Sequence, residues 1–212
     1  MILSKRLHAI AKLINENEVV YDVGTDHGLL PCFLVVNGLS KAYASDIKEK
    51  PLNKAKENIQ RFHLEDKVIP VLYDGVDTNK SDVTTLVFAG MGFYTVKQCL
   101  DKLDLSKYSK IIIQINNNVK KLREYISNNE YLITDEVIVK DDFYYEIVVF
   151  NTNKGRKLSD IELEFGPINI EKGDDTFIEY LRYEKDKLRQ INQAKYDLKI
   201  NLIDSLLLTY NK

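Results

Sequence analysis

The stretch VVYDVGTDHGLLP, residues 19–31, decides the fold that this sequence predicts. A short β-branched run ends at Asp22, two glycines follow at Gly24 and Gly28, and an apolar stretch begins directly after them. A glycine here lets the turn pass closely under a ligand, and a helix that starts near Gly28 offers free N–H groups. The stretch therefore predicts a strand, a ligand-binding turn and a helix in succession.

Strand and helix patterns alternate along the rest of the chain. We expect strands at residues 19–23, 41–47, 67–75, 83–90 and 108–115, and two more within 131–150 that are joined around Asp141–Asp142. We expect helices at residues 3–14, 29–36, 51–62, 93–102 and 119–129. Strands separated by helices and followed by a hairpin indicate a mostly parallel seven-stranded sheet with an antiparallel edge. The fold class is therefore α/β, doubly wound.

Composition and charge exclude several classes of protein. The 212 residues are 44% hydrophobic and carry 30 basic and 32 acidic side chains, so any nucleic-acid surface has to be a local patch. Two cysteines without CxxC spacing and three histidines predict neither a disulfide framework nor a zinc site. No segment approaches the roughly 20 apolar residues of a membrane span. We expect a soluble cytoplasmic protein with no membrane segment and no metal.

Acidic residues and glycines follow the predicted strands, at the sheet edge where doubly wound folds bind ligands. Asp46 comes after the second strand, near the spacing from Gly24 at which an acid holds ribose hydroxyls. Asp74 and Gly75 follow the third strand, where a carboxylate can accept an adenine amino proton. Each of these residues alone also fits a turn or a helix cap. Four such strand ends in register favour a ligand that contains a nucleoside.

The residues of the turn after the first strand indicate which nucleoside-containing cofactor the protein binds. A dinucleotide fingerprint has its second glycine where this chain has Asp26, and a carboxylate there would repel a pyrophosphate. Asp22 and Asp26 instead suit the sulfonium and ammonium groups of S-adenosylmethionine. An NAD(P)-dependent oxidoreductase is the disfavoured alternative. The expected cofactor contacts are Asp22, Gly24, Thr25, Asp26, His27, Gly28, Asp46, Ile47, Asp74, Gly75, Ala89 and Gly90.

Basic residues form candidate surfaces for a polyanion. Residues 107–123 contain no acid and carry Lys107, Lys110, Lys120, Lys121 and Arg123, and Lys5 and Arg6 lie on the leading helix. From Thr176 onward Leu181, Leu188, Ile191, Leu198 and Leu202 recur at helical spacing, which predicts a coiled-coil-like element, either one long helix or a bent pair. Lys185 and Arg189 lie on this element beside acidic neighbours. A solvated helix face is the alternative for each surface.

Longer motifs resemble the bacterial tRNA (adenine(22)-N1)-methyltransferase family, a class I S-adenosylmethionine-dependent group with a Rossmann-like domain and a C-terminal helical coiled coil. The matching segments are LSKRLHAIA (3–11), DVGTDHGLLP (22–31), VFAGMG (87–92), IQINNNVKKLREYI (113–126), DEVIVKDDFYYEIVV (135–149) and FGP (165–167). The chain departs from the family at Ile115, where proline is usual, and at Phe93, where a small residue is usual. The resemblance implies a methyltransferase domain over residues 1–155 and a C-terminal extension over 156–212.

The resemblance further implies methyl transfer to N1 of adenine 22 in the D-arm region of tRNA, and we expect a monomer. The adenine N1 lone pair attacks the methyl group in line, so the protein chiefly orients a flipped base. Methylation of another RNA base and a non-catalytic RNA-binding module are the alternatives. Core packing is the alternative role of Met91, loop hydrogen bonding is that of Gln114 and Asn116, and ordering of the turn is that of His27. Residues expected at the reacting base are Asp26, Gly90, Met91 and Asn116, and residues expected to contact tRNA are Lys5, Arg6, Gln114, Asn116, Lys120, Lys121, Arg123, Lys185 and Arg189.

Overall fold

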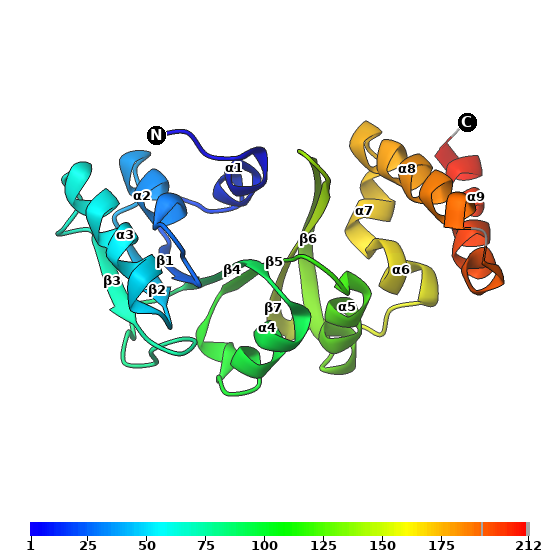
Figure 1. Cartoon of the computed structure of the whole chain (residues 1–212). Coiled ribbons are helices and arrows are strands. Elements are labelled where there is room, and N and C mark those ends of the chain that lie inside the picture. The colour runs from blue at the N-terminus through cyan, green and yellow to red at the C-terminus, as the bar shows by residue number, and fades with distance from the viewer. Residues whose placement is uncertain (192, 211–212) are drawn as a thin grey trace.

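A computed structural model describes residues 1–191 and 193–210 (Figure 1). The strands of this described part are β1 (Val19–Val23), β2 (Lys41–Asp46), β3 (Val68–Leu72), β4 (Thr85–Met91), β5 (Lys110–Ile115), β6 (Tyr131–Lys140) and β7 (Tyr144–Lys154). The helices before the hairpin are α1 (Lys5–Lys12), α2 (Leu29–Val36), α3 (Glu49–Arg61), α4 (Phe93–Leu100) and α5 (Val119–Asn128). The later helices are α6 (Asp160–Phe165), α7 (Pro167–Lys172), α8 (Asp175–Ile191) and α9 (Asp197–Tyr210).

The strands of the described residues join into a seven-stranded sheet of order β3-β2-β1-β4-β5-β7-β6. The pairs from β3 to β5 are parallel, whereas β7 runs antiparallel to both β5 and β6. The chain therefore travels past β5 to the outer edge, forms β6, and returns to insert β7 between them. The predicted doubly wound α/β fold with an antiparallel edge is confirmed.

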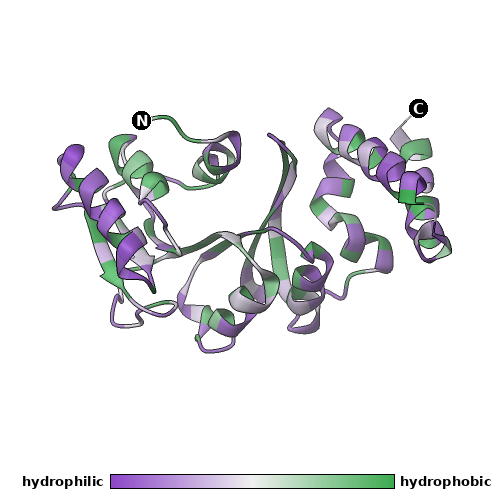
Figure 2. Ribbon diagram, in the orientation of Figure 1, coloured by the Kyte–Doolittle hydropathy of each residue, from purple (hydrophilic) through white to green (hydrophobic). Residues whose placement is uncertain are grey.

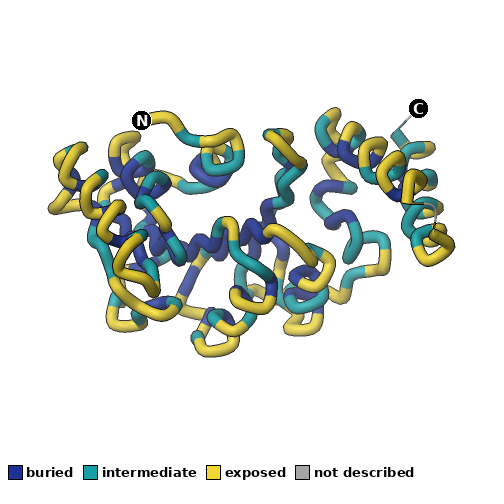
Figure 3. Tube along the Cα trace, in the orientation of Figure 1, coloured by how far each residue is buried: buried dark blue, intermediate teal, exposed yellow. Residues whose placement is uncertain are grey.

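Helices cover both faces of the sheet. Ile10 of α1, Leu30 of α2 and Ile59 of α3 pack on one face, and Val96 of α4 and Leu122 of α5 pack on the other. Figure 1 shows α4 and α5 on the opposite side of the sheet from α1 and α2. Figure 2 shows that α2 is largely hydrophobic, and Figure 3 shows the central strands among the most buried segments. Because both faces are covered, a ligand can reach the sheet only at an edge.

Helices α6 to α9 pack beside the outer strand β6. Phe165, Phe177, Leu181 and Ile203 form a separate apolar cluster that includes Ile138 of β6. No helix in the described ranges is long and apolar enough to cross a bilayer. The predicted domain boundary at residue 155 stays a prediction.

The C-terminal element has the bent-pair form, because α8 and α9 are separate helices that contact each other. Leu181 and Leu188 are buried as expected from the spacing. Ile191 and Leu198 were expected on the same apolar seam, but they are 42% and 72% exposed, and Ile203 and Leu206 form the buried side of α9 instead. The predictions for Ile191 and Leu198 are therefore wrong, because α8 ends at Ile191 and α9 begins after a turn with a different face toward the core. Residues 192 and 211–212 of this predicted element lie outside the described residues.

Candidate active site

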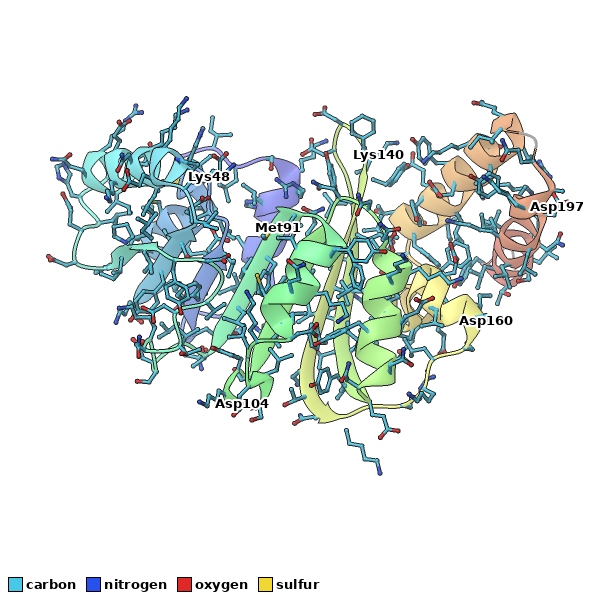
Figure 4. All side chains as sticks on the ribbon, turned by 60° about the horizontal axis from the view of Figure 1, so that its bottom comes forward. Lys48, Met91, Asp104, Lys140, Asp160 and Asp197 are labelled. Atoms are coloured by element: carbon cyan, nitrogen blue, oxygen red, sulfur yellow. The ribbon has the colours of Figure 1, made fainter. Side chains whose placement is uncertain are left out.

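The candidate site lies at the carboxyl edge of the sheet, where the strand order reverses between β1 and β4. From β1 the chain crosses to β2 on one side, and after β3 it returns to β4 on the other side. Figure 4 shows Lys48, Met91 and Lys140, which follow or end β2, β4 and β6, along one edge, with Asp104 at the opposite edge. The strand-end residues expected to bind a ligand therefore lie along one edge of the sheet.

Asp22 is the buried acid of β1. Its Oδ2 accepts the hydroxyl proton of Thr25 at 2.6 Å, and the Thr25 N–H donates to the Ser45 carbonyl at 2.8 Å, which ties the turn to β2. Burial raises the pKa of Asp22 to about 7, against the lowering effects of the Thr25 hydroxyl and the Arg6 guanidinium. Asp22 can therefore change between its neutral and ionised forms near neutral pH.

The turn after β1 depends on Gly24. Its φ is 70°, a conformation that other residues rarely adopt, and the Met91 sulfur lies 3.5 Å from the position that a Cβ would take. Asp26 also has a positive φ of 52°, and its largely exposed carboxylate lies 3.5 Å from Nε2 of His27. The turn thus places Met91 against Gly24 and presents Asp26 to solvent.

Gly28 and His27 join the turn to α3. A Cβ on Gly28 would lie 2.9 Å from the Cβ of Ala55, so α2 can start this close to α3 only from a glycine. The Asn58 side chain donates to the His27 carbonyl at 2.9 Å, and the His27 Nε2 lies 3.4 Å from the Lys54 amine. These contacts hold the backbone at His27 in place.

The ends of β2 and β3 carry the other expected acids. Asp46 is half-buried, and its Oδ1 accepts the Lys48 N–H at 2.8 Å, which is the local turn bond that its position before α3 predicts. Asp74 and Ile47 are exposed on the same edge. Gly75 has a φ of 93°, and its carbonyl accepts the Ser45 hydroxyl at 3.4 Å. One Asp46 oxygen therefore serves the turn, and the second is available for a ligand.

A hydrogen-bonded network joins the ends of β4 and β5. The strand pairing shifts register between Ala89 and Met91, and Gly90, in the bulge, has a φ of 82°. Its N–H donates to Oε1 of Gln114 at 3.0 Å, and its carbonyl accepts from Nδ2 of Asn116 at 2.8 Å. The bulge thus aims the Gly90 backbone at two amide side chains, one buried and one exposed.

Two residues expected to contact tRNA act inside this network instead. Arg6 donates to the same Gln114 oxygen, and its guanidinium lies 5.6 Å from the ring centre of Tyr145. Gln114 is fully buried, so it cannot meet a substrate edge. The prediction of direct tRNA contact is therefore wrong for Gln114, and Arg6 is tied to the network across the site. Gln114 positions Gly90 and lies 3.4 Å from Asn116.

Arg123 is not part of the basic surface that the sequence predicts. It is fully buried, donates to Glu136 at 2.7 Å and Glu146 at 2.6 Å, and also donates to the Glu164 carbonyl at 3.1 Å. Burial opposes its charge, but the Glu146 and Glu136 carboxylates raise the pKa of Arg123 above its ordinary range. The prediction that Arg123 contacts phosphate is wrong, because its guanidinium ties α5 to the hairpin and to α6.

The remaining basic residues differ in their surroundings. Lys5, Lys120, Lys121 and Arg189 are exposed. Lys120 lies 3.1 Å from Glu164, and Lys185 is paired with Asp204 of α9. Their contact with tRNA stays a prediction. Within the described part of the chain, no group of three or more His, Cys, Asp or Glu side chains is arranged to hold a metal ion.

Sequence reasoning missed the aromatic residues at the tip of the β6–β7 hairpin. Phe143 is exposed there, Tyr144 packs against Tyr183 of α8 with ring centres 5.0 Å apart, and Tyr145 lies beside Arg6. The run FYY directly after two aspartates is the signal that could have identified them, because turns usually carry Gly, Pro, Asn, Asp or Ser and not a large apolar ring such as that of Phe143.

The chain is similar to known methyltransferases. Residues 3–148 match the family model of the methyltransferase domain. The chain is 32% identical over 152 residues to the tRNA (adenine(22)-N(1))-methyltransferase of Bacillus subtilis (strain 168), in an alignment that covers 69% of this chain and 64% of that enzyme.

Two solved structures extend the similarity over almost the whole chain. M. capricolum TrmK in complex with S-adenosyl-homocysteine matches with a TM-score of 0.82 and 35% identity over 98% of both chains. A Streptococcus pneumoniae protein in complex with S-adenosyl-L-methionine matches with a TM-score of 0.85 and 28% identity over 97% of this chain and 100% of that one. The resemblance noted from the sequence motifs is therefore confirmed. Since the family model covers more than half of the sequence, this chain belongs to the methyltransferase domain family.

Proposed function

We propose that this protein transfers a methyl group from S-adenosylmethionine to N1 of adenine 22 in tRNA. The observation that carries the proposal is the arrangement at the β1–β4 switch point. The acids Asp22 and Asp46 flank the Gly24 turn there, and Gly90 and Asn116 form a hydrogen-bonded pair at the ends of the next strands. The relatives support the reaction and the target base, and this arrangement offers groups for the cofactor and for the base.

The residues present fit S-adenosylmethionine. Asp22, Asp46 and Asp74 lie at or just after the ends of three adjacent strands, and opposite charge favours a ligand with a sulfonium and an ammonium group. The second carboxylate oxygen of Asp46 suits the ribose hydroxyls. Gly24 has no side chain that would stand between the turn and the cofactor. When bound, S-adenosylmethionine supplies an electrophilic methyl group, and these residues hold and orient it.

The other half of the site suits an adenine edge. Asn116 is exposed while its Nδ2 donates to the Gly90 carbonyl, so its Oδ1 has a fixed direction in which to accept a hydrogen bond from the amino group of a base. Met91 is partly buried beside Gly24, where its side chain can pack against the face of a ring. Adenine N1 is itself the nucleophile, so the protein needs no nucleophilic side chain.

Methylation at N1 leaves the base cationic until the amino group releases a proton. We propose that the carboxylate of Asp26 accepts this proton from the amino group. Asp26 is exposed and lies in the turn beside the Gly24–Met91 contact. Replacing Asp26 with asparagine should then slow transfer while leaving tRNA affinity unchanged.

The test is incubation of the protein with radiolabelled S-adenosylmethionine and unmethylated tRNA, followed by nucleoside analysis. Label in 1-methyladenosine is the expected result. Asp46→Asn is the matched variant, because an asparagine oxygen can still accept the Lys48 N–H and keep the turn. It should weaken cofactor binding by about 10- to 100-fold, since it removes a charged acceptor. Label in another nucleoside, or tRNA binding without any transfer, would overturn the proposal.

A further inference from the structure

A hollow opens beside the candidate active site, between the sheet and the C-terminal helices. It has a volume of about 740 Å³, within the range of roughly 300–1,000 Å³ that is usual for small-ligand sites. The loop 116–118 after β5 forms one wall, the β7 end of the hairpin forms another, and α8 forms the third. In Figure 1 the end of the β6–β7 hairpin stands between α1 and α8. We call this hollow the hairpin pocket.

Aromatic rings make up much of the hairpin pocket. The ring centre of Tyr144 lies 5.0 Å from that of Tyr183 and 5.5 Å from that of Tyr180. Tyr183 is 42% exposed, and Phe143 at the hairpin turn is 66% exposed. Exposed aromatic rings grouped in this way are the platforms on which unpaired nucleic-acid bases stack.

The charges that face the hairpin pocket are paired within the protein. Lys199 Nζ lies 2.9 Å from Glu164 and 3.2 Å from Glu184, and Glu146 accepts a hydrogen bond from Arg123 at 2.6 Å. A pocket whose carboxylates and amines already neutralise one another favours neither a phosphate nor a cation. It suits an uncharged planar group such as a nucleobase.

Polar groups that can read the edge of a base line the same pocket. Asn116, Asn117 and Asn118 are exposed, and the Asn118 side chain donates to the Asn117 side-chain oxygen at 3.2 Å. Carboxamides offer both donors and acceptors, as base edges require. Asn116 also donates to the Gly90 carbonyl, so it belongs both to the hairpin pocket and to the site proposed for the reacting adenine.

Most of the hairpin pocket lies farther along the sheet than the site proposed for the reacting base, and the two share Asn116. The residues proposed for the cofactor lie at the ends of β1, β2 and β3, and Gly90 lies in β4, whereas the pocket begins at β5 and reaches beyond β7. Since neighbouring strands are about 4.8 Å apart, β7 lies roughly 10 Å from β4. A nucleotide close to the methylated adenine in the same RNA could span this distance.

We propose that the hairpin pocket binds a second unpaired nucleotide of the tRNA, whose base stacks on Tyr183 and Phe143. The proposal rests on the proposed function only for the identity of the RNA. Its role is to fix the RNA while the target adenine occupies the site at Gly90.

The test compares Tyr183→Leu with Tyr183→Phe, because leucine removes the ring and phenylalanine keeps it. The dissociation constant for unmethylated tRNA is measured by filter binding, which does not depend on turnover. We expect roughly a tenfold weaker complex for Tyr183→Leu and an unchanged one for Tyr183→Phe. Phe143→Leu, at the exposed hairpin turn, should show the same loss without a change in melting temperature.

The outcomes separate this proposal from the proposed function. Unchanged tRNA affinity in both leucine variants would overturn the second-nucleotide site, even if the wild-type protein methylates tRNA. Loss of kcat at saturating tRNA with unchanged affinity would also overturn it, because the pocket would then hold the reacting base. Absence of methyl transfer by the wild-type protein would overturn the proposed function, while the binding comparison would still decide whether the pocket holds a base.

Discussion

The stability of this protein should depend on pH through Asp22. Burial raises the pKa of Asp22 from its ordinary value of 3.8 to about 7. The unfolded chain therefore loses this proton near pH 4, whereas the folded protein keeps it until near pH 7, and the stabilising effect of the bound proton is lost as the pH rises through this window. The pKa difference lowers the free energy of unfolding by about 4 kcal/mol at pH 8, and about 2.5 kcal/mol of this develops between pH 5 and pH 8.

Asp22→Asn is the variant that isolates this effect. It keeps the shape of the side chain and an oxygen that can accept the Thr25 hydroxyl proton, but it cannot ionise. Urea unfolding followed by circular dichroism at pH 5, 6, 7 and 8 measures the free energy of unfolding of both proteins, and other titrating groups cancel in the difference. We expect the variant to gain about 2.5 kcal/mol relative to the wild type across this range. A difference that does not change with pH would refute the reasoning.

Three further results are expected. Arg123→Gln should lower the free energy of unfolding at pH 7 by about 3–5 kcal/mol, because two carboxylates lose their buried partner. A decrease below about 1 kcal/mol, measured by urea unfolding, would contradict this prediction. Gly28→Ala should cost about 2–4 kcal/mol in the same assay, since a side chain there requires a strained φ and meets α3, and a near-neutral change would show that the helices can separate. Binding of S-adenosylmethionine at pH 6 should release a proton from Asp22, because the positive ligand favours the ionised carboxylate. The binding enthalpy measured by calorimetry should then differ between buffers of different ionisation enthalpy, and equal enthalpies would contradict the prediction.

The sequence predicts the strand ends well because local chemistry determines them. The β-branched run before Asp22 and the glycines after it specify a strand and a turn without help from distant residues, and the structure has both. The capping box of Ser159 and Glu162 is an equally local signal, and it could have predicted α6, which our reading of the sequence left out.

Long-range pairing explains what the sequence did not predict. Arg123 shares its helix with the exposed Lys120 and Lys121, so it resembles another surface cation until Glu136 is placed opposite it. A register shift between Ile133 and Asp135 turns Glu136 inward, and alternation along the strand does not forecast such a bulge.

Arg6 shows the same limit within the site. Its partner Gln114 lies 108 residues away, and only the tertiary fold, which packs α1 against β6 and α2, brings the two together. The strand ends expected to contact a ligand could therefore be predicted from the sequence. The side chains that brace them could not.

The most direct test of the proposed function uses two unmethylated tRNA transcripts that differ only at position 22, one with adenine and one with guanine. Both are incubated with the protein and S-adenosylmethionine, and the methylated nucleotide is located by nuclease digestion and mass spectrometry. We predict one methyl group at N1 of adenine 22 in the first transcript and none in the second. Equal methylation of both transcripts, or a methyl group at another position, would contradict the proposed function.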